Sequence, residues 1–305
     1  MILCFDIGGT AIKPAEAFSP TDLRLRDRMP TPAHDYDAFV GVLRHAIETS
    51  SQRPSVLAFS MAGVLDPETG AATVANIPCL TGRRLQTELE AALGLPVVLA
   101  NDADAFALAE ATVGAGKGHE VVLGVILGTG VGGGVVIRGE LINASGGFAG
   151  EWGHGPVAQR ILGQPEAILP AFPCGCGQVG CLDAICSARG MEKLHRALHG
   201  TEADSLAIVS GWQADEAAAA RTIAIWLEML SGPLSMVGNL LGAGIIAVGG
   251  GLSNSAPLIA SLDTEVRARI LRRMGRPLVV PALCKIEPGL VGAAILGLRR
   301  AGEVL

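Results

Sequence analysis

The chain has 305 residues, half of them hydrophobic, and a formal net charge of −6. This length predicts two domains or one large one, with ample apolar material for a core. The acidic balance and the lack of any Lys/Arg run argue against a nucleic acid partner. Glycine or charge interrupts the apolar stretches before the ~20 residues that a membrane span needs, so no membrane partner is expected.

The cysteines and the first residues indicate the compartment. The chain opens MILCFDIGG, which has no basic segment before its short apolar run, so we expect no secretory signal. Seven cysteines are an odd count, and their spacing suits a metal site better than disulfides. We therefore expect a cytoplasmic protein.

Short apolar strands alternate with helical patterns, which predicts an α/β fold. Strands are expected at residues 2–7, 56–61, 97–100, 121–127, 134–137 and 245–248, and helices at 37–52, 103–113, 216–242, 257–274 and 290–301. The helix over 216–242 contains Gly232-Pro233, so we expect it to bend or break there. Residues 114–118 carry no periodic pattern and are the expected hinge between two domains.

Two glycine-rich turns share one plan. FDIGGTAIK at 5–13 and LGTGVGGGVV at 127–136 each combine an apolar strand, Gly/Thr turn residues and a second strand. Such turns expose backbone N–H groups and let phosphate oxygens approach closely, so two of them could clamp a polyphosphate. Asp6 would lie where Mg²⁺ or its water shell needs a carboxylate. The alternative is two ordinary hairpins.

Two better-known phosphate motifs do not apply. Gly128, Gly130 and Gly133 match G-x-G-x-x-G, but the dinucleotide motif must open a helix and this one runs into the strand-like VVIRGELI. Gly116-Lys117 resembles part of a P-loop. The pattern fails because residue 118 is Gly and residue 111 is Ala.

Asn101-Asp102 is the candidate for chemistry. The pair follows the apolar segment PVVLA and precedes a predicted helix, and ligands of α/β folds bind at the carboxyl ends of strands. Asp102 could accept the proton of a hydroxyl that attacks a γ-phosphate, and Asn101 could hold a neighbouring sugar hydroxyl. Alternatively, Asp102 is the N-cap of the helix. Glu151, between Gly150 and Gly153, is either a ligand or a loop carboxylate.

A metal site is predicted by four residues in a glycine-rich stretch. Three thiols with one and four residues between them follow an imidazole 20 positions upstream, a set that suits tetrahedral Zn²⁺. The residues are His154, Cys174, Cys176 and Cys181. The alternative is a chance cluster of cysteines.

Six ordered motifs then indicate a family. FDIGGT, NDADAFALAE, ILGTGVGGG, GEWGH, CGCGQVGC and VGGGLSN occur in the order of the ROK family of sugar kinases and repressors. The chain resembles this family from its first strand to its last helix, and within it resembles the bacterial N-acetyl-D-glucosamine kinases. The resemblance implies the actin-like ATPase (ribonuclease H-like) fold, two α/β domains around a cleft. We expect domains at 1–116, joined by the C-terminal helix at 289–305, and at 117–288 with the zinc site.

The resemblance also implies residue roles. Asp102 would be the catalytic base that takes the proton of the sugar 6-hydroxyl. Sugar ligands would be Gly63, Asn76, Asn101, Asp102, Glu151, His154 and Asp183. ATP and Mg²⁺ would be bound by Asp6, Gly8, Gly9, Thr10, Thr129, Gly130, Gly249, Gly250 and Gly251. The zinc would be structural, because four protein ligands leave no open position, and His154 would use one ring nitrogen for zinc and the other for sugar. A homodimer is compatible with the resemblance.

The sequence departs from the family pattern at three places. Residue 11 is Ala where the family usually has Lys, with Lys13 two positions on. Ala62-Gly63 replaces the usual Pro-Gly, and Asp183 replaces a Glu that contacts the sugar. A shorter Asp side chain reaches less far, so the sugar shifts or a water bridges the gap.

Four hypotheses for the function remain. The first is phosphorylation of the 6-hydroxyl of N-acetyl-D-glucosamine. The second is a ROK kinase for N-acetylmannosamine, glucose or fructose. The third is a repressor, which in this family carries an N-terminal helix-turn-helix domain; this chain begins at the first phosphate strand, so we expect none. The fourth is a non-catalytic, zinc-containing sugar-sensing protein.

Overall fold

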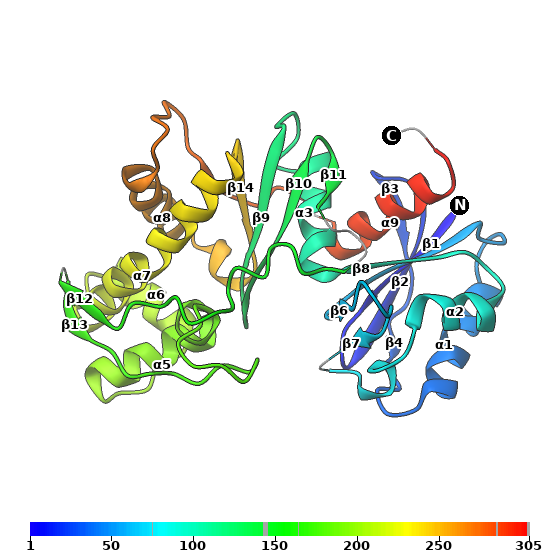
Figure 1. Ribbon diagram of the computed structural model, residues 1–305, viewed down its shortest axis with the longest axis horizontal. Coiled ribbons are helices and arrows are strands. Elements are labelled where there is room, and N and C mark those ends of the chain that lie inside the picture. Colours follow the sequence, from blue (N-terminus) through cyan, green and yellow to red (C-terminus); the bar gives the residue numbers. More distant parts are fainter. Residues whose placement is uncertain (75, 143–145, 164, 285, 304–305) are drawn as a thin grey trace. The chain divides into compact units, whose positions relative to one another are not determined.

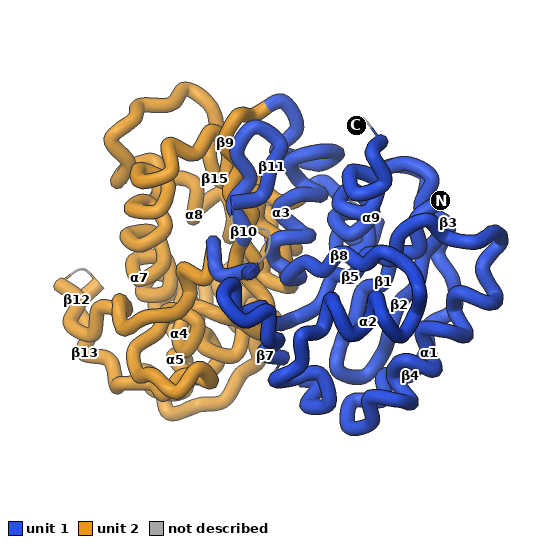
Figure 2. The backbone as a smooth tube through the Cα atoms, turned by 45° about the vertical axis from the view of Figure 1, so that its right-hand side comes forward, with its two compact units in different colours: residues 1–118, 134–149, 283–305 blue, residues 119–133, 150–282 orange. Residues whose placement is uncertain are grey.

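The computed structural model describes residues 1–74, 76–142, 146–163, 165–284 and 286–303. These form two compact units (Figure 2). Unit 1 comprises residues 1–118, 134–149 and 283–305, and unit 2 comprises 119–133 and 150–282. The main difference from the predicted domains is that residues 134–149 lie in unit 1. This segment packs closely against the rest of unit 1 at Gly134, where a Cβ would lie 2.8 Å from the backbone oxygen of Ala103.

Unit 1 is built on a six-stranded mixed sheet in the order β3-β2-β1-β5-β8, with β4 also paired to β2. β1 pairs antiparallel with β2 and parallel with β5, and β5 pairs parallel with β8. The strands are β1 (Ile2–Ile7), β2 (Ala11–Ser19), β3 (Asp22–Leu25), β4 (Met29–Pro30), β5 (Val56–Met61) and β8 (Val97–Asn101). The short strands β6 (Val64–Leu65) and β7 (Ala72–Thr73) form a separate hairpin.

Helices cover both faces of this sheet (Figure 1). Because side chains alternate along a strand, Ile2 and Cys4 of β1 join the cluster against α9 (Pro288–Arg300), whereas Leu3 and Phe5 join the opposite cluster. That second cluster contains α1 (Tyr36–Glu48) and α2 (Leu85–Leu93). The helix α3 (Asp102–Val113) packs against α9. Because β1, β5 and β8 run parallel, their carboxyl ends lie at one edge of the sheet.

Unit 2 is organised around the sheet β11-β10-β9-β14-β15, and the unit boundary falls inside β10. β14 pairs parallel with both β9 and β15. The strands are β9 (Val121–Leu127), β10 (Val131–Ile137), β11 (Glu140–Leu141), β14 (Ile245–Gly249) and β15 (Val279–Pro281), with a hairpin of β12 (Ile161–Gly163) and β13 (Glu166–Ile168). The helices are α4 (Asp183–Cys186), α5 (Ala188–His199), α6 (Ser205–Gln213), α7 (Ala217–Leu241) and α8 (Ala256–Arg269), and the chain also has 3-10 turns at Pro78–Leu80 and Gly251–Asn254.

The predicted elements agree in kind with these, and two differences have clear physical causes. α1 begins at Tyr36 because the Asp35 side chain accepts a hydrogen bond from the Ala38 N–H. α7 runs through Pro233 as one helix, so of the bend or break predicted at Gly232-Pro233 the break is wrong, and the bend stays a prediction. A proline removes a single donor, and the buried residues on both sides of it, such as Leu230 and Leu234, hold the helix in the core.

α7 is also the one helix in the described part of the chain with the length and composition of a membrane span. Half of the window that meets this criterion is buried inside the protein, and Trp226 in it is fully buried. This burial is typical of a core helix of a large fold.

Close contact between α9 and α3 depends on Gly292. A Cβ at this position would lie 2.1 Å from the backbone oxygen of Ala105, so Gly292→Ala should lower the free energy of unfolding by about 1–3 kcal/mol. Gly41 in α1 is the matched control, because a Cβ added there would have no neighbour within 4 Å. Gly41→Ala should stabilise by about 0.5–1 kcal/mol through helix propensity. Urea unfolding measures both, and equal effects would contradict this packing.

Candidate active site

The first phosphate turn lies between β1 and β2 in unit 1. The Gly8 N–H donates to the Ala11 carbonyl at 3.0 Å, and the Thr31 hydroxyl donates to the Gly8 carbonyl at 2.7 Å. A Cβ at Gly9 would lie 2.9 Å from the Cβ of Asn76, so only a glycine lets this loop approach so closely. The structure thus brings Asn76, a predicted sugar ligand, beside the predicted phosphate residues Gly8, Gly9 and Thr10.

Asp6 lies at the end of β1, and polar groups surround its carboxylate. Oδ2 is 3.3 Å from the Lys13 ammonium, and Oδ1 accepts a hydrogen bond from the Ser60 hydroxyl at 3.4 Å. A Cβ at Gly289, in the first turn of α9, would lie 2.8 Å from Oδ1. The N-terminus of a helix favours negative charge nearby, so α9 and Lys13 both stabilise this carboxylate.

Asn101, rather than Asp102, is the N-cap of α3. Its Oδ1 accepts hydrogen bonds from the Ala103 and Asp104 N–H groups at 2.8 and 3.4 Å. Its Nδ2 donates to the Gly63 carbonyl at 3.0 Å, which ties the end of β8 to the loop after β5. Gly63 has a φ of +156°, and a Cβ there would lie 2.7 Å from the Thr73 carbonyl oxygen. The capping role that the sequence left open for Asp102 therefore belongs to its neighbour.

Asp102 is left with one carboxylate oxygen for chemistry. Oδ1 accepts from the Ala103 N–H at 2.9 Å, and Oδ2 accepts no hydrogen bond from another side chain within the described residues. Burial raises the pKa of Asp102 above its ordinary value, and the negative charge of Asp6 raises it further. A carboxylate with a raised pKa is a stronger base, which suits proton abstraction near neutral pH.

The second phosphate turn lies between β9 and β10 in unit 2. The Gly128 N–H donates to the Gly130 carbonyl at 3.0 Å, and the Ala188 N–H donates to the Gly128 carbonyl at 2.8 Å. Gly250, with a φ of +84°, packs so closely that a Cβ would lie 2.5 Å from the Leu127 carbonyl oxygen. The predicted nucleotide residues Gly250 and Gly251 thus lie beside Leu127 and Gly128, at the start of the turn that holds the predicted phosphate residues Thr129 and Gly130. Gly249 precedes Gly250 in the chain.

The four predicted metal ligands form a single cluster. Their ligand atoms all lie within 4.8 Å of one another, with the His154 Nδ1 3.6 Å from the Cys174 Sγ and the Cys176 and Cys181 sulfurs also 3.6 Å apart. A tetrahedral zinc ion with Zn–S bonds of ~2.3 Å requires ligand atoms at roughly such separations. A backbone hydrogen bond from Gln178 lowers the pKa of Cys176 to about 7, so one thiol ionises readily. The donor set is that of a structural zinc site.

His154 and Glu151 extend this cluster. The His154 Nε2, the ring nitrogen that does not approach Cys174, is 3.7 Å from the Glu151 Oε2. The metal cluster therefore fixes the orientation of an imidazole whose second nitrogen faces a predicted sugar ligand. This matches the geometry that the double use of His154 requires, and the sugar contact itself stays a prediction.

Asp183 connects the metal cluster to the second turn. Its Oδ1 accepts from the Val131 N–H at 2.8 Å, and its Oδ2 accepts from the Cys174 thiol at 3.5 Å. Its own N–H donates to the Gly153 carbonyl at 2.9 Å. The Trp152 indole donates to the Gly132 carbonyl of the same turn at 3.1 Å. The Val131 bond occupies the Asp183 Oδ1, whereas a zinc-bound Cys174 is a thiolate and cannot donate to the Asp183 Oδ2.

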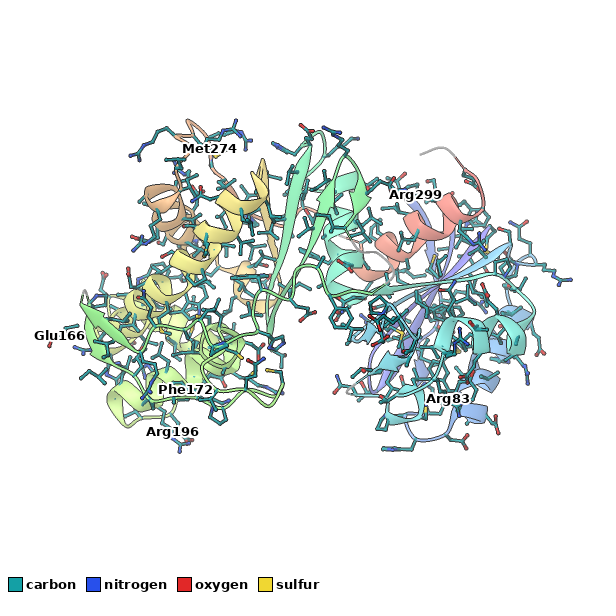
Figure 3. All side chains as sticks on the ribbon, viewed as in Figure 1. Arg83, Glu166, Phe172, Arg196, Met274 and Arg299 are labelled. Carbon is teal, nitrogen blue, oxygen red and sulfur yellow. The ribbon has the colours of Figure 1, made fainter. Side chains whose placement is uncertain are left out.

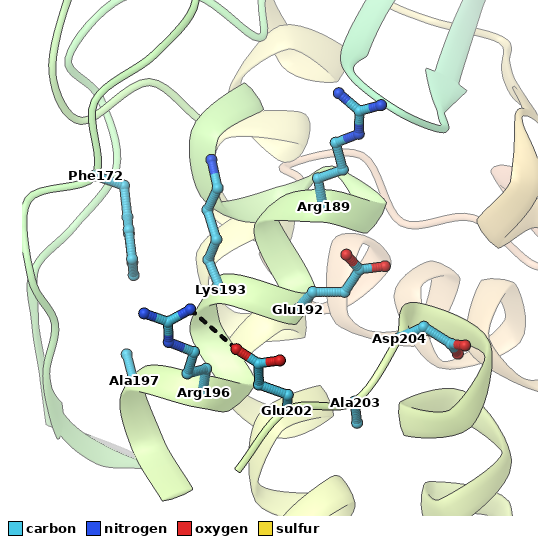
Figure 4. Close-up of a pocket in the computed structure, with 9 residues that line it drawn as sticks. All are labelled: Phe172, Arg189, Glu192, Lys193, Arg196, Ala197, Glu202, Ala203 and Asp204. Carbon is cyan, nitrogen blue, oxygen red and sulfur yellow. Dashed lines mark hydrogen bonds and ion pairs between the residues drawn. The ribbon is translucent and has the colours of Figure 1, made fainter. Parts of the chain in front are cut away.

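A cavity of about 940 Å³ opens beside α5 in unit 2 (Figure 4). Phe172 and Arg196 lie at the same end of the unit (Figure 3), and Arg196 pairs with Glu202 at 3.2 Å. Arg189 and Lys193, one turn apart on α5, have no ionic partner within the described residues. Glu192, Glu202 and Asp204 line the same cavity, so its lining has three cations and three carboxylates.

No local sequence pattern marks this cavity or the partners of Lys13. Glu287, whose carboxylate binds the Lys13 ammonium, is 274 positions away in the chain. In the sequence, α5 carries Arg189, Lys193 and Arg196 with one acid, Glu192, and looks like an ordinary solvated helix face. The structure shows the partners of the neighbouring acids. The Asp204 side chain accepts from the Ala207 N–H at the start of α6, and Glu202 pairs with Arg196.

Comparison with known proteins identifies the class. The ROK family model matches residues 2–300, and the chain belongs to this family. It is 34% identical over 297 residues to the N-acetylgalactosamine kinase AgaK of Shewanella sp. (strain ANA-3), covering 96% of this chain and 95% of that one. It is 33% identical to the N-acetyl-D-glucosamine kinase of Histophilus somni (strain 129Pt), covering 97% and 98%.

Solved structures agree with this assignment. The ROK hexokinase from Thermus thermophilus superimposes with a TM-score of 0.83 at 29% identity, covering 99% of both chains. The ROK family glucokinase from Streptomyces griseus, in complex with glucose and AMPPNP, gives a TM-score of 0.72 at 25% identity and covers 97% of this chain and 98% of that one. The protein is a ROK sugar kinase with the actin-like fold of that family.

The metal cluster yields a direct test. Purified native protein should contain about one zinc ion per chain by elemental analysis. Cys176→Ser should remove the zinc, lower the melting temperature and weaken sugar binding about tenfold, because His154 loses its anchor. Cys79→Ser is the control, since Cys79 lies outside the cluster and its thiol donates to the Pro32 carbonyl. A native protein that is free of zinc yet fully active would contradict a structural metal.

Proposed function

We propose that this kinase transfers the γ-phosphate of ATP to the 6-hydroxyl of N-acetyl-D-glucosamine, with Asp102 as the catalytic base. The observation that carries the proposal is that Asn101 and Asp102 have different roles at the start of α3. Asn101 satisfies the helix cap, so Asp102 keeps an oxygen that no other side chain in the described part of the protein occupies. Full-length similarity to N-acetyl-D-glucosamine kinases supports the choice of sugar.

The base has the properties that the reaction needs. As the sugar oxygen attacks phosphorus, its proton must leave, and a positioned carboxylate accepts it. The raised pKa of Asp102 increases its affinity for that proton. After the product departs, Asp102 returns the proton to solvent and regains its charge.

Other side chains bind and orient the reactants. Asn76, Glu151 and His154 are the proposed sugar ligands, and the exposed N–H groups of the two glycine turns bind the phosphates. Asp6 offers the hard carboxylate oxygen that magnesium prefers, and it would hold the ion directly or through water. When bound, magnesium neutralises charge on the phosphates of ATP. The zinc cluster holds His154 in place without entering the reaction.

N-acetyl-D-galactosamine is a second candidate substrate. The Shewanella relative that is named for it is 34% identical to this chain, which is as similar as the N-acetyl-D-glucosamine kinases are. The two sugars share the 2-acetamido group and differ only in the configuration at C4. The acetamido group is therefore the better supported part of the assignment. We also propose that the enzyme acts in the cytoplasm, where ATP and reduced thiols are available.

A sugar panel tests the substrate. We expect kcat/KM for N-acetyl-D-glucosamine to exceed that for glucose and fructose by about 10–100-fold, the usual value of one well-bound group. A coupled ATP assay with N-acetylgalactosamine and N-acetylmannosamine in the same panel measures this. Preference for N-acetylgalactosamine would favour the second candidate. A preference for glucose would contradict both.

The base is tested by Asp102→Asn. The variant should bind sugar normally but lose about 10²–10⁴-fold in kcat, because its amide cannot accept the proton. In the native enzyme, kcat/KM should fall as pH decreases through the raised pKa of Asp102, at a higher pH than for an ordinary carboxyl group. A pH–rate profile and sugar titration measure these effects.

Stability provides the control for this variant. A carboxyl group whose pKa rises on folding destabilises the protein in its ionised form, so the penalty is absent below the ordinary pKa and grows as pH rises toward the raised one. At pH 7, Asp102→Asn should thus unfold at the same or a higher temperature than the native protein, since Asn keeps the Oδ1 acceptor. Loss of activity through unfolding would not support a base role, and full turnover by the folded variant would exclude it.

A further inference from the structure

Lys13 lies at the centre of a charged cluster in unit 1. It is directly opposite Asp6 in the antiparallel pairing of β1 and β2, so the two side chains share one face of the sheet. Its ammonium is 3.3 Å from the Asp6 Oδ2 and 2.8 Å from the Glu287 Oε2. Arg28 approaches the other oxygen of Glu287 at 3.6 Å. Two cations and two carboxylates thus form a chain that ends at Asp6.

The cluster leaves the Asp6 carboxylate little rotational freedom. Lys13 contacts Oδ2, while the Ser60 hydroxyl and the first turn of α9 at Gly289 approach Oδ1. The contacts come from three different elements, β2, β5 and α9. A carboxylate oriented in this way at the end of β1 adjoins the turn of Gly8 and Gly9, the predicted phosphate turn.

Stability alone does not account for this arrangement. The Lys13, Asp6 and Glu287 side chains remain 29%, 24% and 32% exposed, and ion pairs with such access to water contribute little to stability. Aliphatic residues fill the neighbouring clusters, so the fold does not require charge here. The larger effect expected of the cluster is therefore on the direction of the Asp6 oxygens.

We propose that Lys13 is a positioning residue that orients Asp6 for the magnesium ion of bound ATP, with Glu287 as its anchor. This inference rests on the kinase class of the protein and not on the identity of its sugar. Lys13 acts through Asp6, and the phosphates are held by the turn itself. Groups that orient a metal ligand typically change metal affinity about 10–100-fold when they are removed.

The test compares nucleotide binding with and without magnesium. Lys13→Met should weaken the binding of AMPPNP in the presence of Mg²⁺ about tenfold, and should raise the Mg²⁺ concentration for half-maximal turnover by a similar factor. Binding of metal-free AMPPNP, measured by calorimetry in EDTA, should not change. Lys13→Arg should restore most of the magnesium effect, because it keeps a cation opposite Asp6.

Arg28→Gln is the matched control. It removes a cation from the same cluster, but Arg28 contacts Glu287 and not Asp6, so both binding constants should stay within about twofold of the native values. Glu287→Gln removes the anchor and should give an intermediate magnesium effect. This variant also keeps the proposal testable if Lys13→Met fails to fold.

The outcomes are distinct. Equal weakening of AMPPNP binding with and without Mg²⁺ would mean that Lys13 contacts phosphate itself, which overturns the positioning role. Unchanged magnesium dependence in Lys13→Met would overturn it too. Because the binding measurements use no sugar, they remain valid if the sugar panel rejects N-acetyl-D-glucosamine, and the two proposals can fail separately.

Discussion

The hydrogen bonds of Asn101 are the constraint on which the proposed chemistry depends. One side-chain oxygen caps α3, and the amide nitrogen holds the loop at Gly63, so β8, α3 and the loop after β5 meet at a single residue. Without this cap, Asp102 would be the nearest acceptor for the first N–H groups of α3. With the cap in place, the Asp102 Oδ1 shares only the Ala103 N–H with Asn101, and burial together with the charge of Asp6 raises the pKa of Asp102.

Unit 2 uses close backbone approach to organise its part of the chemistry. A Cβ at Gly153 would lie 2.1 Å from the Val131 carbonyl oxygen, so the GEWGH loop packs directly on the second phosphate turn. Asp183 bonds the same turn and the Cys174 thiol. The metal cluster, the turn and His154 are consequently parts of one connected assembly. In the proposed mechanism zinc stabilises both a sugar ligand and a phosphate site without taking part in the reaction.

Much of this arrangement is predictable from the sequence. The strands that end at Ile7, Met61 and Leu127 match their predicted bounds, because runs of buried apolar residues ended by glycine or turns are strong local signals. The metal ligands are predictable because their spacing is local. Of the predicted bend or break at Pro233, the break is wrong, since tertiary burial of α7 outweighs the loss of one hydrogen bond. The sequence-based prediction considers Asp102 alone as the N-cap of α3, and the structure assigns that role to Asn101, because Asn and Asp are both good N-cap residues and local sequence does not separate them.

The sequence by itself determined the α/β class, the positions of both glycine turns, the Asn101-Asp102 pair and the metal-ligand set, because each depends on residues that are near one another in the chain. The tertiary structure alone decided that Asn101 rather than Asp102 caps the helix, that the Asp183 Oδ1 bonds to the Val131 N–H, and that Lys13 joins Asp6 to Glu287. These outcomes depend on distances between residues as far as 274 positions apart, and such distances are fixed only when sheets and helices pack together.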